Sequence, residues 1–263
     1  MKKLTSFHLK IIAITTMVID HAFKIFTNDI FSWMQSQQLF TIPNYILFMF
    51  ILAIGRIAFP LFAYMIAEGC YYTRNIKKYI LRLCLLGIVS EIPFQYMIAI
   101  LNNQAYSFSF SLGNVFFTLA LGASAIEAYR YLKEKSNNLI FLSLPVILCS
   151  VIAQILNTDY SAPGVLLIFF CYCFRETKYW YRPILIFNLF LYALYMPFLG
   201  IMNFGLDWIV ILEAIFSISF SCLSLFVIKQ YNHQRGKAVK WLFYVFYPLH
   251  IAVLVGLYYV THL

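Results

Sequence analysis

The chain has 263 residues, of which 63% are hydrophobic and only 11% are charged. Soluble domains average about 45–50% apolar and about 25% charged residues, so this composition excludes an ordinary soluble protein and indicates an integral membrane protein. The formal net charge is +9, which in a soluble protein would suggest nucleic-acid binding. Here the basic residues lie in short loops between apolar runs, so orientation in a bilayer explains the charge, and no nucleic-acid partner is expected.

Long apolar runs recur along the chain, and a helix needs about 20 apolar residues to cross a bilayer. No linker or charge run separates them, so residues 1–263 are expected to form one domain. The second run is unusually long, and Pro60 within it has no N–H to donate, which predicts a tilt or a break there. The runs predict an all-α bundle of nine transmembrane helices, at residues 8–26, 43–73, 78–101, 114–132, 138–157, 162–176, 180–200, 207–229 and 239–261.

The basic residues alternate between the two ends of these runs. All except Lys24 and Arg56 fall in five clusters: Lys2, Lys3 and Lys10; Arg74, Lys77, Lys78 and Arg82; Arg130, Lys133 and Lys135; Arg175, Lys178 and Arg182; Lys229, Arg235, Lys237 and Lys240. The segments between them, at 27–42, 102–113, 158–161 and 201–206, contain neither Lys nor Arg. The positive-inside rule therefore predicts a cytoplasmic N-terminus and a C-terminus outside.

An acid and an imidazole, Asp20 and His21, stand inside the first apolar run. Ionisable groups at bilayer depth are expensive and usually functional. At the helical rise, His21 lies about 16 Å from Lys10 and His250 lies about 15 Å from Lys240, so the two imidazoles share a depth. A neutral imidazole accepts a proton at neutral pH, so His21 is a candidate general base and His250 a second functional candidate. The alternative for His21 is a histidine hydrogen-bonded in a helix interface.

Three further ionisable residues are predicted near that depth. Consecutive helix residues point about 100° apart, so Asp20 is expected to face another span, such as that of Arg56, rather than His21. Arg56 keeps its charge and could hold a carbonyl, a phosphate or a developing oxyanion, or pair with Asp20 or Glu91. Glu91, about 20 Å from the inner end of its helix, is either a partner of His21 or Arg56 or purely structural.

Other polar residues stand close to predicted helix ends. Caps and turns use the residue types found at the outer ends: Asn114, Asp159, Tyr160 and Asp207. Glu213 lies slightly deeper and is ambiguous, whereas Glu68 lies near an inner end and is expected to form a surface pair with Arg74. The sequence contains no HExxH, Walker, GxGxxG or GxSxG motif, so neither a metal nor ATP hydrolysis is expected.

Several of these residues belong to segments that resemble the TraX family. The Asp20-His21 segment and Ser90-Glu-Ile-Pro-Phe94 are two of them. The resemblance covers nearly the whole chain in family order, at residues 9–21, 55–62, 90–94, 113–118, 159–168 and 241–250. It implies an integral membrane protein of a bacterial conjugation system, located in the cell membrane. The founding activity of the family is acetylation of the pilin amino terminus.

The resemblance also implies how the residues are used. TraX proteins are similar in outline to the acyltransferase type 3 group, which transfers acetyl from cytoplasmic acetyl-CoA and needs a membrane-embedded histidine and arginine. Those roles would fall on His21 and Arg56, with Glu91, His250 and Asp20 in support. Cofactor binding would involve Arg56 and the inner basic residues Arg74, Lys77 and Lys78. The outer residues Asn114, Asp159 and Tyr160 would face the acceptor, although Ser161-Ala-Pro163 departs from the family's small residues there.

The expected function is therefore transfer of acetyl to an amine or hydroxyl of a protein, peptide or glycan, with His21 as general base. Two alternatives come from other classes. A transporter or proton-coupled channel could use the same buried charges, although many transporters carry internal repeats and none is visible here. A non-enzymatic scaffold of a conjugation or secretion complex would leave the buried polar residues without a role.

Overall fold

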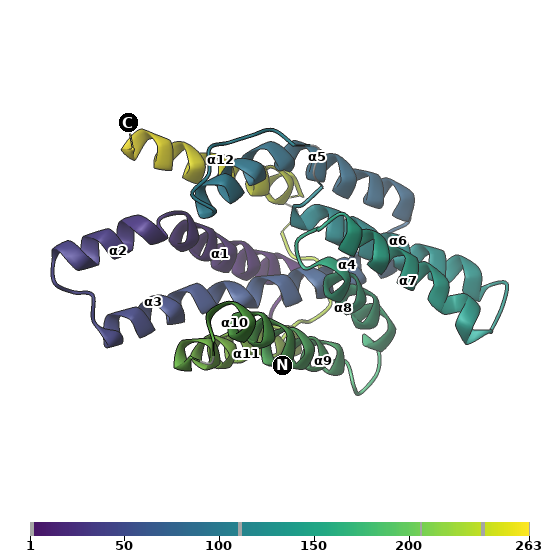
Figure 1. The fold of residues 1–263 in the computed structure, drawn as a ribbon. Coiled ribbons are helices and arrows are strands. Elements are labelled where there is room, and N and C mark those ends of the chain that lie inside the picture. The colour runs from purple at the N-terminus through teal and green to yellow at the C-terminus, as the bar shows by residue number, and fades with distance from the viewer. Residues whose placement is uncertain (1–2, 110–111, 206, 238–239, 263) are drawn as a thin grey trace. The chain divides into compact units, whose positions relative to one another are not determined.

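The computed structural model describes residues 3–109, 112–205, 207–237 and 240–262, and helices make up most of these ranges (Figure 1). No strand forms within them, and the extended pairing that they contain is an isolated parallel bridge between Leu4 and Tyr231. The predictions that involve Lys2 and residues 110, 111, 206 and 239 fall outside the described residues. The all-α fold expected from hydropathy is confirmed.

The chain divides into two compact units. The first consists of Met1–Leu61, Tyr96–Tyr106 and Leu185–Leu263, and the second of Phe62–Gln95 and Ser107–Ile184. Three of the four boundaries fall inside helices, because each unit takes part of the helices Ala58–Tyr72, Ile76–Leu101 and Arg182–Asn188. The fourth, between Tyr106 and Ser107, falls in a non-helical segment. The organisation as a single domain stays a prediction.

The first unit holds the N-terminal and C-terminal helices. Its elements are α1 (Ser6–Ile25), α2 (Thr27–Ser36), α3 (Ile42–Ile54), the 3-10 turn η1 (Gly55–Ile57), the π-helix η2 (Leu189–Tyr195), α10 (Met196–Phe204), α11 (Trp208–Lys229) and α12 (Lys240–Thr261). α1 packs against α3, η1 and α12, and α11 packs against α3, η1 and η2. The short η1 turn is therefore flanked by helices from both ends of the chain.

The second unit is built around three mutually packed helices, α6 (Val115–Lys133), α7 (Leu139–Ile155) and α8 (Ser161–Phe174). Most of α4 (Ala58–Tyr72) and α5 (Ile76–Leu101) also belong to it, and α9 (Arg182–Asn188) begins in it. α6 turns a face of small and apolar residues inward. A Cβ at Gly122 would overlap the side chain of Ile168, so this glycine lets α6 and α8 approach closely.

Five helical runs of the described residues are long and apolar enough to cross a membrane. They are Ile42–Tyr72, Ile76–Leu101, Arg182–Asn203, Trp208–Lys229 and Tyr244–Thr261. α7 and α8 are apolar but shorter, whereas α1 and α6 carry several charged residues. The chain is thus a helical membrane protein, while nine spans and the orientation of the termini stay predictions.

Two helical runs contain irregular turns that prolines explain. Within Ile42–Tyr72, the 3-10 turn η1 lies just before Pro60, as the predicted break requires, because the proline cannot donate to the carbonyl of Arg56. Within Arg182–Asn203, the π-helix η2 lies just before Pro197. The sequence did not predict α2, because its ten residues are polar enough to read as a loop.

Candidate functional site

The two histidines that share a predicted depth are in contact. His21 on α1 and His250 on α12 lie with Nδ1 and Nε2 2.9 Å apart, and their rings are nearly parallel. Nδ1 of His250 lies 2.9 Å from the carbonyl oxygen of Phe246, one turn back on the same helix. The edge of Tyr247 meets both imidazoles. An imidazole pair is therefore held between the first and last helices of the first unit.

The hydrogen-bond partners assign the protons of this pair. A carbonyl oxygen only accepts, so Nδ1 of His250 carries a hydrogen and donates it to Phe246. In a neutral His250, Nε2 then accepts, and Nδ1 of His21 must be the donor. This leaves Nε2 of His21 with a lone pair, which is the form that a general base requires.

Asp20 faces away from its neighbour His21, as the helical geometry predicted. Its Oδ2 accepts a hydrogen bond from Nζ of Lys24 at 2.6 Å, one turn along α1, so it forms an ion pair with Lys24, and a direct ion pair with Arg56 stays a prediction. The side chain is buried against Gly55, where an added Cβ would overlap it. Because Asp20 touches Gly55, their chain neighbours His21 and Arg56 lie at the same level of the first unit.

Arg56 lies in the η1 turn and forms an ion pair with Glu213 of α11, with Nη2 and Oε1 3.9 Å apart. Its Cζ lies 5.7 Å from the centre of the Tyr192 ring, within the range of a cation–π contact. The side chain of Glu213 is 63% exposed, so this ion pair is accessible rather than buried. The sequence did not decide whether Glu213 has a functional role. Its place one and a half turns inside α11 was the only feature that could have pointed to one.

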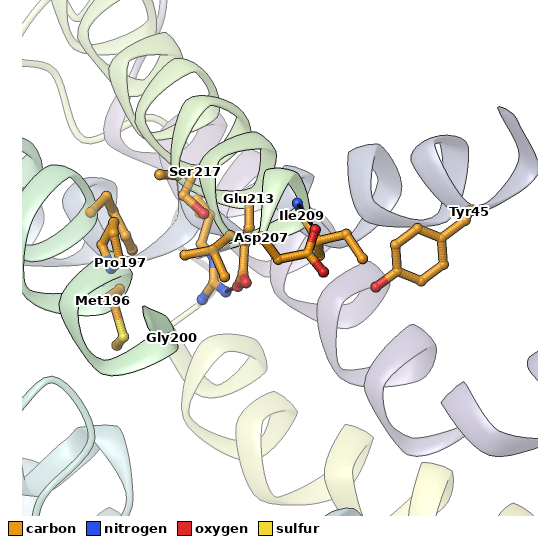
Figure 2. Close-up of a pocket in the computed structure, with 12 residues that line it drawn as sticks. Tyr45, Met196, Pro197, Gly200, Asp207, Ile209, Glu213 and Ser217 are labelled. Carbon is orange, nitrogen blue, oxygen red and sulfur yellow. Dashed lines mark hydrogen bonds and ion pairs between the residues drawn. The ribbon is translucent and has the colours of Figure 1, made fainter. Parts of the chain in front are cut away.

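Arg56 and Glu213 belong to a cavity of about 400 Å³ in the first unit. Figure 2 shows Glu213 and Ser217 reaching it from α11, Asp207 from the position just before α11, and Tyr45 from α3. Its other lining residues are Arg56, Tyr192, Met196, Pro197, Gly200, Ile209, Val210 and Ala214. Asp207 also caps α11, because its Oδ1 accepts the N–H of Ile209 at 3.2 Å. The cavity can therefore admit a small polar group beside a fixed guanidinium.

Glu91, on α5, accepts hydrogen bonds from residues at the N-terminus of α6 in the second unit. Its carboxylate accepts from Nδ2 of Asn114 at 2.6 Å and from the backbone N–H of Gly113 at 3.2 Å. Asn114 caps α6 by accepting the N–H of Phe116 and also donates to the carbonyl of Gly87. Glu91 and Asn114, expected in separate roles, thus form one buried joint between α5 and α6. A role for Glu91 beside His21 stays a prediction.

The other two outer residues lie next to that joint. The backbone N–H of Asp159 donates to the carbonyl of Gly113 at 2.7 Å. Its own carbonyl accepts from the hydroxyl of Thr118. Tyr160 has a φ of +62°, a left-handed conformation that is uncommon outside glycine, where the chain turns into α8. The structure therefore brings Asn114 and Asp159 together, while contact with an acceptor stays a prediction.

The inner basic residues expected to meet the cofactor lie where α5 begins. Arg74 precedes the helix, Lys77 and Lys78 lie in its first turn, and all three are exposed. A helix N-terminus and three cations attract an anionic group. Binding of acetyl-CoA phosphates at this place stays a prediction.

Glu68 was expected to form a surface pair with Arg74, and this was wrong. It is buried, and its Oε1 lies 2.5 Å from Nε of Arg175, which follows α8. Tyr71 stacks on that guanidinium, 3.5 Å from its Cζ to the ring centre. Burial acts to lower the pKa of Arg175, but hydrogen bonding to Glu68 raises that pKa above its ordinary value. The pair fastens α4 to the end of α8.

A model of the TraX protein family matches residues 6–258. The chain belongs to the TraX family. Among curated proteins it is 33% identical over 150 residues to a probable fimbrial assembly protein FimC, serogroup H1, of Dichelobacter nodosus. That match covers 55% of this chain and 56% of the relative, so the chain spans about half the length of the protein it matches. No solved structure matches this TraX protein.

Proposed function

We propose that this TraX protein is a membrane-embedded acetyltransferase that moves acetyl from cytoplasmic acetyl-CoA to an amine or hydroxyl acceptor, with His21 as general base. The observation that supports this best is the His21–His250 hydrogen bond, because it leaves Nε2 of His21 with a lone pair. The proposal follows the family's resemblance to membrane acetyltransferases, and the site described above offers the groups that such chemistry needs.

The first step is attack of the acceptor on the thioester carbonyl carbon. Nε2 of His21 removes the proton of the acceptor as the new N–C or O–C bond forms. The imidazolium that results still donates from Nδ1 to His250, and this hydrogen bond strengthens with the charge. His250 therefore stabilises the protonated base and keeps its ring oriented.

The second step is collapse of the tetrahedral intermediate. The carbon–sulfur bond breaks, the CoA sulfur leaves and takes the proton from His21, and the products are the acetylated acceptor and free CoA thiol. Arg56 meets the oxyanion that forms between the two steps, since its guanidinium stays charged and lines an open cavity. The ion pair with Glu213 holds that guanidinium in place before substrate arrives.

In this proposal the two substrates approach from opposite faces of the membrane. Arg74, Lys77 and Lys78 meet the phosphates of acetyl-CoA at the basic inner ends of the helices. The acceptor enters from the side that lacks Lys and Arg, where Asn114, Asp159 and Tyr160 lie. By its family and its fimbrial relative, the protein would act in the bacterial cell membrane on a pilus protein, another peptide or a glycan.

The purified protein in lipid nanodiscs tests the proposal. We expect it to release CoA thiol from acetyl-CoA in the presence of an amine-bearing or hydroxyl-bearing acceptor, and to produce an acetylated product visible by mass spectrometry. His21→Ala should reduce the rate by about 10²–10⁴-fold, the usual worth of a general base. His233→Ala, in the loop before α12, is the matched control and should retain the rate. Full activity in His21→Ala would refute the assignment.

A further inference from the structure

A buried polar cluster in the first unit has no part in the proposed transfer. Asn188, at the end of α9, is 2% exposed. Its Oδ1 accepts the hydroxyl of Ser221 at 2.6 Å, and its Nδ2 lies 3.1 Å from Sγ of Cys222. Ser221 is itself fully buried, and both partners lie on α11. The cluster therefore pins one end of α9 to the middle of α11.

The π-helix η2 begins directly after this pin. Pro197, just beyond η2, cannot donate to the carbonyl four residues earlier, and its ring would clash with that carbonyl in a regular α-helix. The wider π turns relieve the clash before the chain resumes as α10. Each residue added to a helical turn rotates the residues after it by about 100°, so the pin and the proline together set which way η2 points its side chains.

Tyr192 is the η2 residue that faces the candidate site. It is buried, it lines the cavity, and its ring lies 5.7 Å from Cζ of Arg56. Arg56 itself lies in a 3-10 turn, so both groups depend on irregular turns for their direction. A small rotation of η2 would move the ring off the guanidinium and let Arg56 swing away from this position into the open cavity.

We propose that Asn188 and Ser221 are positioning residues that act through Tyr192 to aim Arg56. This inference rests on the proposed function for its effect on the reaction rate, but not for its effect on the geometry of Arg56. Because Arg56 would act on the oxyanion of the transition state, misaiming it lowers kcat and leaves the KM for acetyl-CoA nearly unchanged.

The experiment compares five variants with the wild-type protein in nanodiscs. Asn188→Leu and Ser221→Ala break the pin, Tyr192→Leu removes the ring, and Ser219→Ala is the matched control. Ser219 lies on the same helix, but its hydroxyl donates to its own helix at the carbonyl of Ile215. The readouts are kcat, KM for acetyl-CoA, and the rate at which phenylglyoxal modifies Arg56, mapped by peptide mass spectrometry.

We expect the first three variants to lower kcat by about tenfold to a hundredfold, the cost of a misplaced catalytic group, with KM almost unchanged. They should also raise the modification rate of Arg56 severalfold, whereas Ser219→Ala should change neither quantity. Tyr192→Phe keeps the ring and should stay close to wild type. If Asn188→Leu does not fold, Ser221→Ala and Tyr192→Leu carry the test.

Two outcomes would overturn the inference. One is a folded Ser221→Ala or Tyr192→Leu protein in which Arg56 reacts with phenylglyoxal at the wild-type rate. The other is a loss of thermal stability in these variants with kcat unchanged, which would show a merely structural role. If the wild-type protein transfers no acetyl group, the proposed function fails, and the modification rate of Arg56 alone decides this inference.

Discussion

Nε2 of His250 lies 2.9 Å from Nδ1 of His21, which joins the last helix of the chain to the first. The same ring of His250 is anchored by Phe246, so its orientation is set by its own helix and not by His21. His250 therefore orients His21, and His21 is the residue of the pair with a ring nitrogen available to accept a proton.

Replacing His250 should slow acetyl transfer without removing the base. We expect His250→Ala to lower kcat by about tenfold to a hundredfold, because His21 then loses the acceptor that fixes its ring and tautomer. His250→Gln retains a side-chain oxygen that can accept from Nδ1 of His21, so it should recover part of the rate. Steady-state kinetics with acetyl-CoA measures both. Equal loss in the two variants would argue against an orienting hydrogen bond.

Gly55 should be intolerant of any side chain. A Cβ there would overlap Asp20, so Gly55→Ala should destabilise the protein by about 1–3 kcal/mol, as overpacking does. Gly256→Ala is the matched control. Among the described residues, none lies within 4 Å of the added methyl, and alanine favours a helix over glycine by about 1 kcal/mol. Thermal unfolding in nanodiscs should show opposite shifts, and a lower melting temperature for both would contradict the packing described.

The cap of α6 should matter more than the cap of α7. Asn114 and Asn138 each accept a backbone N–H at 3.0 Å, but Asn114 is buried and also donates to Glu91 and Gly87. Asn138→Ala should cost about 0.5–2 kcal/mol, the usual worth of a cap. Asn114→Ala should cost about 1–3 kcal/mol more, because it also removes a buried hydrogen bond from Glu91 and one from Gly87. Unfolding free energies for the two variants decide this, and equal values would refute the joint role of Glu91.

Removing one member of the Glu68–Arg175 pair should destabilise the protein strongly, whereas replacing both members with apolar residues should destabilise it little. Arg175→Met removes the charge that neutralises the buried Glu68 carboxylate and should destabilise the protein by about 3–5 kcal/mol. Replacing both members with apolar residues, in Glu68→Leu with Arg175→Met, should recover most of that loss.

Glu176→Gln is the control for this prediction. Glu176 also contacts Arg175, with Oε1 2.9 Å from Nη1, but its side chain is exposed. Its loss should therefore cost at most about 1 kcal/mol. If the double replacement were as unstable as Arg175→Met alone, loss of the Arg175 charge beside the buried Glu68 carboxylate could not be the cause.

Depth along the helices was predictable from the sequence, whereas the neighbours across helices were not. The distances of His21 and His250 from their flanking lysines placed both imidazoles at one level, and the structure brings them into contact. A hydropathy pattern says nothing about which helices pack together. The partners of Arg56 and Glu68 therefore came out as Glu213 and Arg175, residues from distant parts of the chain.

Local irregularity was only half predictable, for a similar reason. Pro60 predicted the break that appears as η1, because a missing donor acts on its own helix. Pro197 carries the same signal for η2, but the direction that η2 gives to Tyr192 also depends on Asn188 meeting Ser221. The cavity arises from that combination of local and long-range effects, and its lining residues lie far apart in sequence.

The central claim is that this protein transfers acetyl groups with His21 as the base. The most direct measurement is comparative mass spectrometry of surface proteins and glycans from cells that carry the gene, lack it, or carry His21→Ala at wild-type protein levels. We predict an acetylated species that disappears on deletion, returns with the wild-type chain and with His233→Ala, and stays absent with His21→Ala. The same acetylated species at full abundance in the His21→Ala cells would contradict the account.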